Sequence, residues 1–193
     1  MPGVNEKYKA IVIGASAGGL HALSGILQNL PPDYSIPIMV VQHRVKDQRY
    51  LLEEVLQSKC KIQIKQADEK ENIQSGFVYI APPDYHLLIE NDKTFSLSSD
   101  EQVRYSRPSI DVLFQSAAIV YRDFLIAIIL TGANDDGAEG IITVKKYGGL
   151  TIAQDPAEAQ FPFMPKAAIE TKEVKHIWKL PEIQNFLLKI ART

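Results

Sequence analysis

Ser16, His43 and Asp136 each stand a few residues beyond a short apolar run of the sequence. Such runs are typical of strands that are buried on both faces of a parallel sheet. In sheets of this kind the ligand crevice lies at the carboxyl ends of the strands, so we expect the three side chains to meet at one edge. Together they are the groups of nucleophilic acyl transfer, in which a serine attacks, a histidine accepts its proton and an aspartate orients the imidazole.

Ser16 is the candidate nucleophile because of the residues around it. The segment Gly14-Ala-Ser-Ala-Gly18 has the spacing of a nucleophile elbow, a tight strand-to-helix turn that presents the serine hydroxyl. The N-terminus of the following helix offers free N–H groups to a developing oxyanion. The alternative is a glycine-rich turn that binds a dinucleotide. That fingerprint requires a glycine at Ser16 and an acidic residue after the second strand, where Val41-Gln-His43 stands.

The base has one serious rival. His43 closely follows the apolar run 36–41, although a histidine there could also be a hydrogen-bonded core residue. His86 lies after a loop at another strand end and competes for the role. His21 falls on the first predicted helix, and His176 lies near the end of the sequence.

The acid is Asp136 or its neighbour Asp135, since both fall in the turn after the most hydrophobic run. The alternative role for either is to cap the helix that follows. Gly132 and Gly137 flank the turn and indicate a more unusual backbone path than a plain cap requires. The order serine, histidine, aspartate differs from the orders of α/β-hydrolases, chymotrypsin and subtilisin.

The elements that position these residues alternate between strands and helices. Apolar runs predict strands at residues 10–13, 36–41, 61–65, 77–80, 124–130 and 150–153. Helical spacing and capping residues predict helices at 20–30, 50–56, 109–121, 137–147, 167–171 and 181–190. The fold class is therefore α/β, with a mainly parallel sheet covered by helices on both faces. Residues 86–90 and 94–98 add an antiparallel hairpin at an edge.

The composition limits what else the chain can be. The 193 residues are 46% hydrophobic and carry a net charge of −2, as in one globular domain without a basic field for nucleic acid. The single cysteine, Cys60, excludes an internal disulfide. The longest apolar run, 124–130, is far short of the ~20 residues that span a bilayer. We expect one cytoplasmic domain over residues 1–193, with its core at 8–190 and no membrane insertion.

Several motifs resemble those of one known family. They are Ile11-Val-Ile-Gly-Ala-Ser-Ala-Gly-Gly19, Val41-Gln-His43, Tyr79-Ile-Ala-Pro-Pro83, Arg107-Pro-Ser-Ile-Asp111, Leu130-Thr-Gly-Ala-Asn-Asp-Asp-Gly-Ala-Glu-Gly140 and Thr151-Ile-Ala-Gln154. In this order and register they resemble the catalytic domain of the CheB-type protein-glutamate methylesterases of bacterial chemotaxis. The resemblance extends over nearly the whole chain.

This resemblance implies a doubly wound sheet and an activity. The activity is hydrolysis of γ-glutamyl methyl esters on chemoreceptor cytoplasmic helices, often with deamidation of glutamines. It implies that Ser16 is the nucleophile, His43 the base and Asp136 the aspartate, and its register excludes Asp135. It implies no metal or organic cofactor. The receptor is the expected partner, and a separate regulator protein is a further one.

The chain departs from the family pattern in several places. Members usually carry a receiver domain, but only residues 1–8 precede the first predicted strand, so we expect no phosphorylation control within this chain. Ala17 stands where many members have threonine, and Ala133-Asn134 where many have Met-Gly. The family's oxyanion contact uses the main-chain N–H at Ala133, which any residue supplies. A basic or aromatic residue that is often found near Ser106 in the family is replaced there, with Tyr105 beside it. The competing hypothesis is a non-catalytic regulatory module with the same fold.

Overall fold

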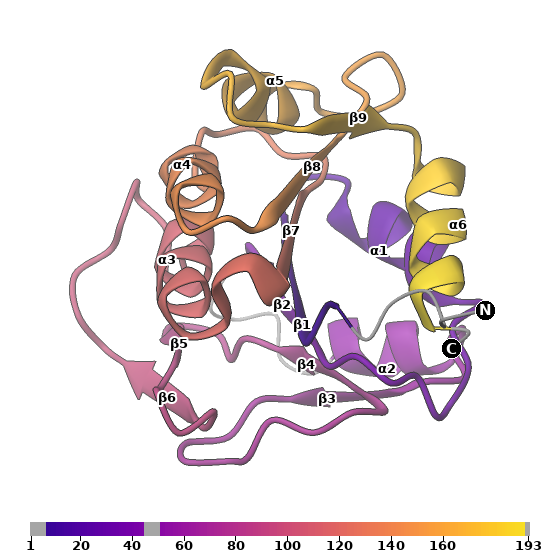
Figure 1. Cartoon of the computed structure of the whole chain (residues 1–193), viewed down its shortest axis with the longest axis vertical. Coiled ribbons are helices and arrows are strands. Elements are labelled where there is room, and N and C mark those ends of the chain that lie inside the picture. Colours follow the sequence, from indigo (N-terminus) through magenta and orange to yellow (C-terminus); the bar gives the residue numbers. More distant parts are fainter. Residues whose placement is uncertain (1–6, 45–50, 192–193) are drawn as a thin grey trace.

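The computed structural model describes residues 7–44 and 51–191 and contains a seven-stranded parallel sheet with helices on both faces (Figure 1). In order across the sheet, the strands are β3 (Gln63–Gln66), β4 (Phe77–Ile80), β2 (Ile38–Gln42), β1 (Ala10–Ala15), β7 (Leu125–Ile129), β8 (Leu150–Gln154) and β9 (His176–Trp178). The helices are α1 (Gly19–Leu27), α2 (Leu51–Gln57), α3 (Ile110–Tyr121), α4 (Ala138–Lys146), α5 (Phe163–Glu170) and α6 (Leu180–Ala191). A short 3-10 helix, η1 (Arg122–Phe124), joins α3 to β7.

The chain changes direction at β1, in the centre of the sheet. On one side of β1 lie β2, β4 and β3, and the chain reaches the edge strand β3 before it returns to β4. On the other side lie β7, β8 and β9, which follow one another outward along the chain. Gly14 pairs with Val41 of β2 and with Ile129 of β7, so these three strands end at the same level. The ends of β1 and β7 form the topological switch point, where doubly wound sheets bind their ligands.

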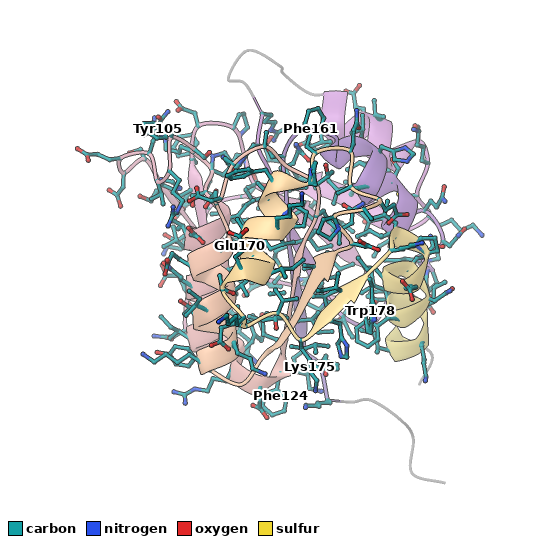
Figure 2. All side chains as sticks on the ribbon, turned by 90° about the horizontal axis from the view of Figure 1, so that it is seen from above. Tyr105, Phe124, Phe161, Glu170, Lys175 and Trp178 are labelled. Carbon is teal, nitrogen blue, oxygen red and sulfur yellow. The ribbon has the colours of Figure 1, made fainter. Side chains whose placement is uncertain are left out.

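The seven strands begin at one end of the molecule and end at the opposite one. Phe124, which directly precedes β7, marks the edge where the strands begin (Figure 2). Phe161 and Tyr105 lie at the other edge, where the strands end (Figure 2). The loops at that second edge carry the candidate site.

The strands are buried on both faces, as their apolar sequences predict. Ile11 and Ile13 of β1 pack into a core with residues of α1 and α6, whereas Ala10 and Val12 pack into a second core with residues of α3 and α4. Helices α1, α2 and α6 lie on one side of the sheet, and α3, α4 and α5 lie on the other (Figure 1). The strand ends are therefore held between two packed helical layers.

The predicted fold class is confirmed, with one difference at the hairpin. β5 (His86–Ile89) and β6 (Phe95–Ser98) are antiparallel, as their sequences predict. They form a separate two-stranded sheet and do not extend the edge of the main sheet. The hairpin instead packs against α3, where Leu87, Ile89 and Phe95 join the core on that face.

Two elements differ from the sequence prediction. Strand β9 was not predicted, and it lies parallel to β8 at the edge of the sheet. Helix α5 begins at Phe163, four residues before the predicted start, and contains Pro165 in its first turn, where the missing N–H costs no helical hydrogen bond. Tyr50, the predicted start of the second helix, lies outside the described residues. Within the described residues, no helix is long and apolar enough to cross a membrane.

Candidate active site

Ser16 lies in the turn between β1 and α1, where both neighbouring strand ends hold its backbone. Its N–H donates to the carbonyl oxygen of Thr131 at 3.0 Å, and its own carbonyl oxygen accepts from Nε2 of Gln42 at 2.8 Å. Gly18 adopts a left-handed φ of 78°, which turns the chain into α1. A Cβ on Gly132 would lie 2.9 Å from the Cβ of Ser16, so a glycine there lets the loop after β7 approach the serine. The turn thus joins β1 to α1 within three residues and places Ser16 directly after the strand.

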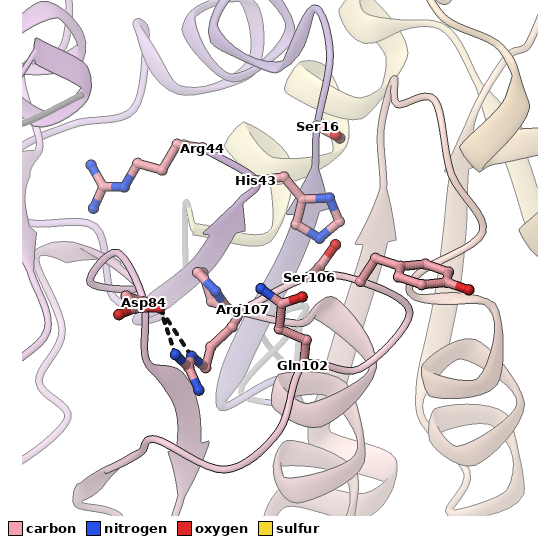
Figure 3. Close-up of a pocket in the computed structure, with 9 residues that line it drawn as sticks. Ser16, His43, Arg44, Asp84, Gln102, Ser106 and Arg107 are labelled. Atoms are coloured by element: carbon pink, nitrogen blue, oxygen red, sulfur yellow. Dashed lines mark hydrogen bonds and ion pairs between the residues drawn. The ribbon is translucent and has the colours of Figure 1, made fainter. Parts of the chain in front are cut away.

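His43 extends from the end of β2 toward the loop after β7. Its Nε2 lies 2.8 Å from Oδ2 of Asp136. Because a carboxylate only accepts hydrogen bonds, we assign the ring hydrogen to Nε2 and the lone pair to Nδ1. Ser16 and His43 line a cavity of about 490 Å³ together with Ser106 and Arg107 (Figure 3). Within the described residues no hydrogen bond joins Oγ of Ser16 to His43, a looseness that is common before substrate binds.

Asp136 is fully buried and accepts four hydrogen bonds. Besides His43, the donors are Oγ of Ser109 at 2.8 Å and the backbone N–H groups of Ile110 at 2.7 Å and Asp111 at 3.0 Å. Burial by itself raises the pKa of a carboxyl group. Here the hydrogen bonds from His43 and from the two backbone N–H groups outweigh burial and hold the pKa of Asp136 below its usual value. The group is therefore an anion at neutral pH and is able to orient the imidazole.

Asp111, in the first turn of α3, connects this helix to the N-terminus of α4. Its Oδ1 accepts the N–H groups of Gly137 at 2.9 Å and Gly140 at 2.7 Å, at the start of α4. Asp136, which closely precedes α4, accepts the first N–H groups of α3. Asp136 thus binds the N-terminus of α3, and Asp111 binds the N-terminus of α4. The helix dipoles favour a negative charge at both places. Burial, and then repulsion by Asp136, raises the pKa of Asp111 to about 6.

The other three histidines lie away from this arrangement. His86 is buried, and its Nε2 donates to the carbonyl oxygen of Glu101 at 2.9 Å while its Nδ1 accepts the N–H of Ser109 at 3.1 Å. Both ring nitrogens are therefore used to hold the loop before α3. His21 is exposed on α1, and His176 stacks on a tryptophan in β9. The structure thus brings only His43 of the four histidines against Asp136.

Asn134, one of the residues that depart from the family pattern, contacts the side of His43 that faces away from Asp136. Its Oδ1 accepts the N–H of Asp136 at 3.3 Å, which orients its amide group. The amide nitrogen then lies 3.4 Å from Nδ1 of His43 and 3.4 Å from Oγ of Ser106. Asn134 therefore faces the same nitrogen that the serine must reach.

Arg104 was not singled out from the sequence, because its partners come from distant segments. Its guanidinium pairs with Asp135, with Oδ2 of Asp111 at 3.3 Å and with Glu139 at 3.8 Å. Asp135, the rival of Asp136 in the sequence, thus points toward this arginine. Ser109 was predicted as the cap of α3, and its bond to Asp136 is a second role that the local pattern could not show.

Ser16, His43 and Asp136 supply a hydroxyl, an imidazole and a carboxylate, the groups that acyl transfer requires. Among these residues no group of three or more histidine, cysteine, aspartate or glutamate side chains could hold a metal ion. A doubly wound α/β sheet with serine, histidine and a buried aspartate at its switch point defines a class of proteins equipped for serine esterase chemistry. The model of the CheB methylesterase family matches residues 11–187, and the chain belongs to this family.

Known proteins resemble the chain in both sequence and structure. A putative protein-glutamate methylesterase/protein-glutamine glutaminase of Leptospira interrogans is 51% identical over 183 residues, which cover 95% of each chain. A Thermotoga maritima protein-glutamate methylesterase/protein-glutamine glutaminase is 38% identical, and the match covers 90% of this chain but 52% of that protein. The crystal structure of the Thermotoga maritima CheB methylesterase catalytic domain matches 95% of this chain with a TM-score of 0.91 and 36% identity. The match covers 98% of that crystallised chain.

Proposed function

We propose that the chain hydrolyses methyl esters of glutamyl side chains in the cytoplasmic part of chemoreceptors. In this proposal Ser16 is the nucleophile, His43 is the base, and Asp136 is the carboxylate that orients His43. The observation that carries the assignment is the 2.8 Å contact between Nε2 of His43 and the buried Asp136, at the cavity that Ser16 also lines. The names of the relatives supply the substrate class, a glutamate methyl ester.

In the first half-reaction Oγ of Ser16 attacks the carbonyl carbon of the methyl ester, and its proton passes to Nδ1 of His43. The imidazolium then donates through Nε2 to Asp136, whose charge stabilises it. Negative charge develops on the carbonyl oxygen and requires N–H donors. The main-chain N–H of Ala133, by the family resemblance, and the start of α1 are the donors at this edge. The intermediate expels methanol, which takes the proton from Nδ1, and a glutamyl ester remains on Ser16.

In the second half-reaction water attacks the glutamyl ester on Ser16 while Nδ1 of His43 accepts a proton. The products are a glutamate side chain and the free serine. A glutamine amide follows the same steps with ammonia as the first leaving group. Because both relatives described above are also named as protein-glutamine glutaminases, we include deamidation as a second activity of the same site.

A non-catalytic signalling module with the same fold is the competing proposal. The family match and the retention of Ser16, His43 and Asp136 support the enzyme. The direct test is release of methanol from a methylated chemoreceptor cytoplasmic fragment by the purified chain. We expect release by the wild type and none by Ser16→Ala.

A fluorophosphonate probe separates the two proposals independently of the receptor. We expect stoichiometric labelling that is lost in Ser16→Ala. Ser106→Ala is the matched control, because it removes the other serine hydroxyl of the same cavity and should retain labelling. Labelling that persists in Ser16→Ala, or a wild type that takes up no label, would contradict the assignment of Ser16.

A further inference from the structure

Tyr105 stands at the wall of the catalytic cavity with almost its entire side chain in solvent. It is 96% exposed, the highest value among the exposed large hydrophobic residues of the described chain. It nevertheless lines the same cavity as Ser16 and His43. One exposed aromatic ring is ordinary on a protein surface, so the reason for its position must come from the backbone that carries it.

The backbone at Tyr105 is held in a conformation that its sequence does not favour. Val103 and Ser106 exchange backbone hydrogen bonds of 3.1 and 2.9 Å around a two-residue loop. Both loop residues have positive φ, 48° at Arg104 and 60° at Tyr105. Loops of this kind are dominated by Asn-Gly and similar pairs, because bulky residues resist positive φ. Surrounding contacts must therefore hold Arg104 and Tyr105 in place.

Arg104 supplies those contacts by pointing inward while Tyr105 points outward. Its guanidinium pairs with Asp111 of α3 and with Asp135 and Glu139 at the start of α4. Asp111 also binds the N-terminus of α4, and Asp136, which closely precedes α4, binds His43. The turn that carries Tyr105 is thus fixed to the same framework that positions the base.

We propose that Tyr105 is a specificity residue that packs against an apolar part of the polypeptide beside the esterified glutamyl side chain. This inference rests on the proposed function. The ester must reach Ser16 inside the cavity, whereas the exposed ring stands at its wall and contacts whatever extends beyond that side chain. A tyrosine on a fixed turn offers a large contact area at a low cost in side-chain entropy. Tyr105 therefore distinguishes a protein ester from a small ester.

The test compares two substrates with the full chain. One is a methylated chemoreceptor cytoplasmic fragment, and the other is the γ-methyl ester of N-acetylglutamate. We expect Tyr105→Ala to raise KM for the fragment about five-fold or more and to leave kcat for the fragment and kcat/KM for the small ester within about two-fold. Tyr105→Phe, which keeps the ring, should behave as the wild type.

Two controls separate contact from a general loss of structure. Phe124→Ala removes an exposed ring at the opposite edge of the molecule and should change neither substrate (Figure 2). In a Ser16→Ala background, where hydrolysis is blocked, Tyr105→Ala should weaken fragment binding by the same factor as it raises KM. Agreement between the two factors shows that the ring acts in binding.

The remaining outcomes overturn either this inference or the proposed function. Equal effects of Tyr105→Ala on both substrates, or no effect on the fragment, overturn the specificity role while the proposed function stands. A wild type that releases methanol from neither substrate overturns the proposed function. A wild type that hydrolyses only the small ester overturns the protein substrate, and the role of Tyr105 with it.

Discussion

The N-termini of α1 and α3 both lie at the edge of the sheet where the strands end, but their N–H groups are used differently. At α3, Ser109 caps the helix and Asp136 accepts the N–H groups of Ile110 and Asp111. At α1, the cap is Gly18, which has no side chain, and the first turn contains no acidic residue. A hollow lined by Ser16 and His43 reaches Gly18 and the start of α1. The start of α3 is therefore closed by a carboxylate, whereas the start of α1 is open to this hollow.

This difference shows how one physical property serves two purposes. The N-terminus of a helix attracts negative charge through its unpaired N–H groups and its dipole. At α3 that attraction holds a permanent charge, Asp136, and so fixes the partner of His43. In the proposed reaction, the same attraction at α1 is available for the negative charge that develops on the substrate oxygen beside Ser16.

The largest effect should come from the residue that precedes the open helix start. Ser16→Ala removes the covalent step, and only oxyanion and binding terms remain, so kcat should fall by about 10³-fold or more. The fold should be unchanged, because Ala15 and Ala17 already flank the site. Methanol release and the thermal unfolding temperature measure the two quantities. Turnover near that of the wild type would show that the nucleophile lies elsewhere.

The closed helix start should be nearly as sensitive. Asp136→Asn puts an NH2 group where the side chain now accepts from His43 or from the N–H groups of α3, so one donor must face another. We expect kcat to fall by about 10²- to 10³-fold and the free energy of unfolding to fall by about 2 kcal/mol. Initial rates and urea unfolding give the two values.

Two matched variants test whether these effects belong to this carboxylate. Asp123→Asn makes the same change of charge at an exposed position before β7 and should leave both quantities near wild type. Asp135→Asn loses an ion pair with Arg104 and should lower kcat far less than Asp136→Asn. The reverse ranking would mean that the orienting acid is misassigned.

The open helix start was predictable from the sequence because it is a local structure. Gly14-Ala-Ser-Ala-Gly18 follows an apolar strand and precedes a helical pattern, and each of these signals lies within about ten residues. The position of His43 followed equally from the end of a buried strand. Strand β9 could not be found in this way, because three residues at an edge depend on pairing with β8.

The carboxylates that close the N-termini of α3 and α4 could be predicted only in part. Ser109 and Asp111 read as an ordinary cap and an ordinary first-turn acid, which they are. The crossing of Asp111 to α4 and of Asp136 to α3 joins segments about 25 residues apart, and no local pattern encodes it. Arg104 is harder still. Its positive φ runs against its own propensity and is set by three distant carboxylates.

The pKa of Asp111 allows a pH-dependent test of the contacts that Asp111 and Asp136 make at the starts of α4 and α3. Its pKa is raised to about 6 in the folded chain from an ordinary value of 3.8, so between these values the folded chain keeps a proton that the unfolded chain has lost. The contribution of this carboxyl to stability is complete below pH 4 and is lost as the pH rises through about 6. Asparagine does not titrate. The stability of Asp111→Asn relative to wild type should therefore increase between pH 4 and 7, by up to about 3 kcal/mol.

Urea unfolding of both proteins at several pH values measures this difference. Asp136 has a lowered pKa, and its contribution is lost as the pH falls. Because both proteins contain Asp136, most of that dependence cancels in the comparison. If the stability of Asp111→Asn relative to wild type stays constant or decreases as the pH rises, ionisation of Asp111 costs the folded chain little free energy.

The smallest effect concerns the hydroxyl of Ser109, which joins both functions of the closed helix start. It donates to Oδ1 of Asp136 at 2.8 Å and accepts from the N–H of Val112. Ser109→Ala should lower the free energy of unfolding by about 1–2 kcal/mol, since a buried bond to a carboxylate and a helix cap are lost together. Ser58→Ala, at the exposed end of α2, should cost much less.

A double-mutant cycle between Ser109→Ala and Asp136→Asn separates the two contributions. If the hydroxyl acts mainly through the carboxylate, the two losses in stability should fall short of adding by about 1 kcal/mol, because the second change finds the bond already broken. The kcat of Ser109→Ala should then fall by about two- to ten-fold with KM unchanged, as His43 loses part of its orientation. Strictly additive losses with kcat unchanged would assign Ser109 to the helix cap alone. The orientation of Asp136 would then rest on the backbone N–H groups of Ile110 and Asp111 at the start of α3.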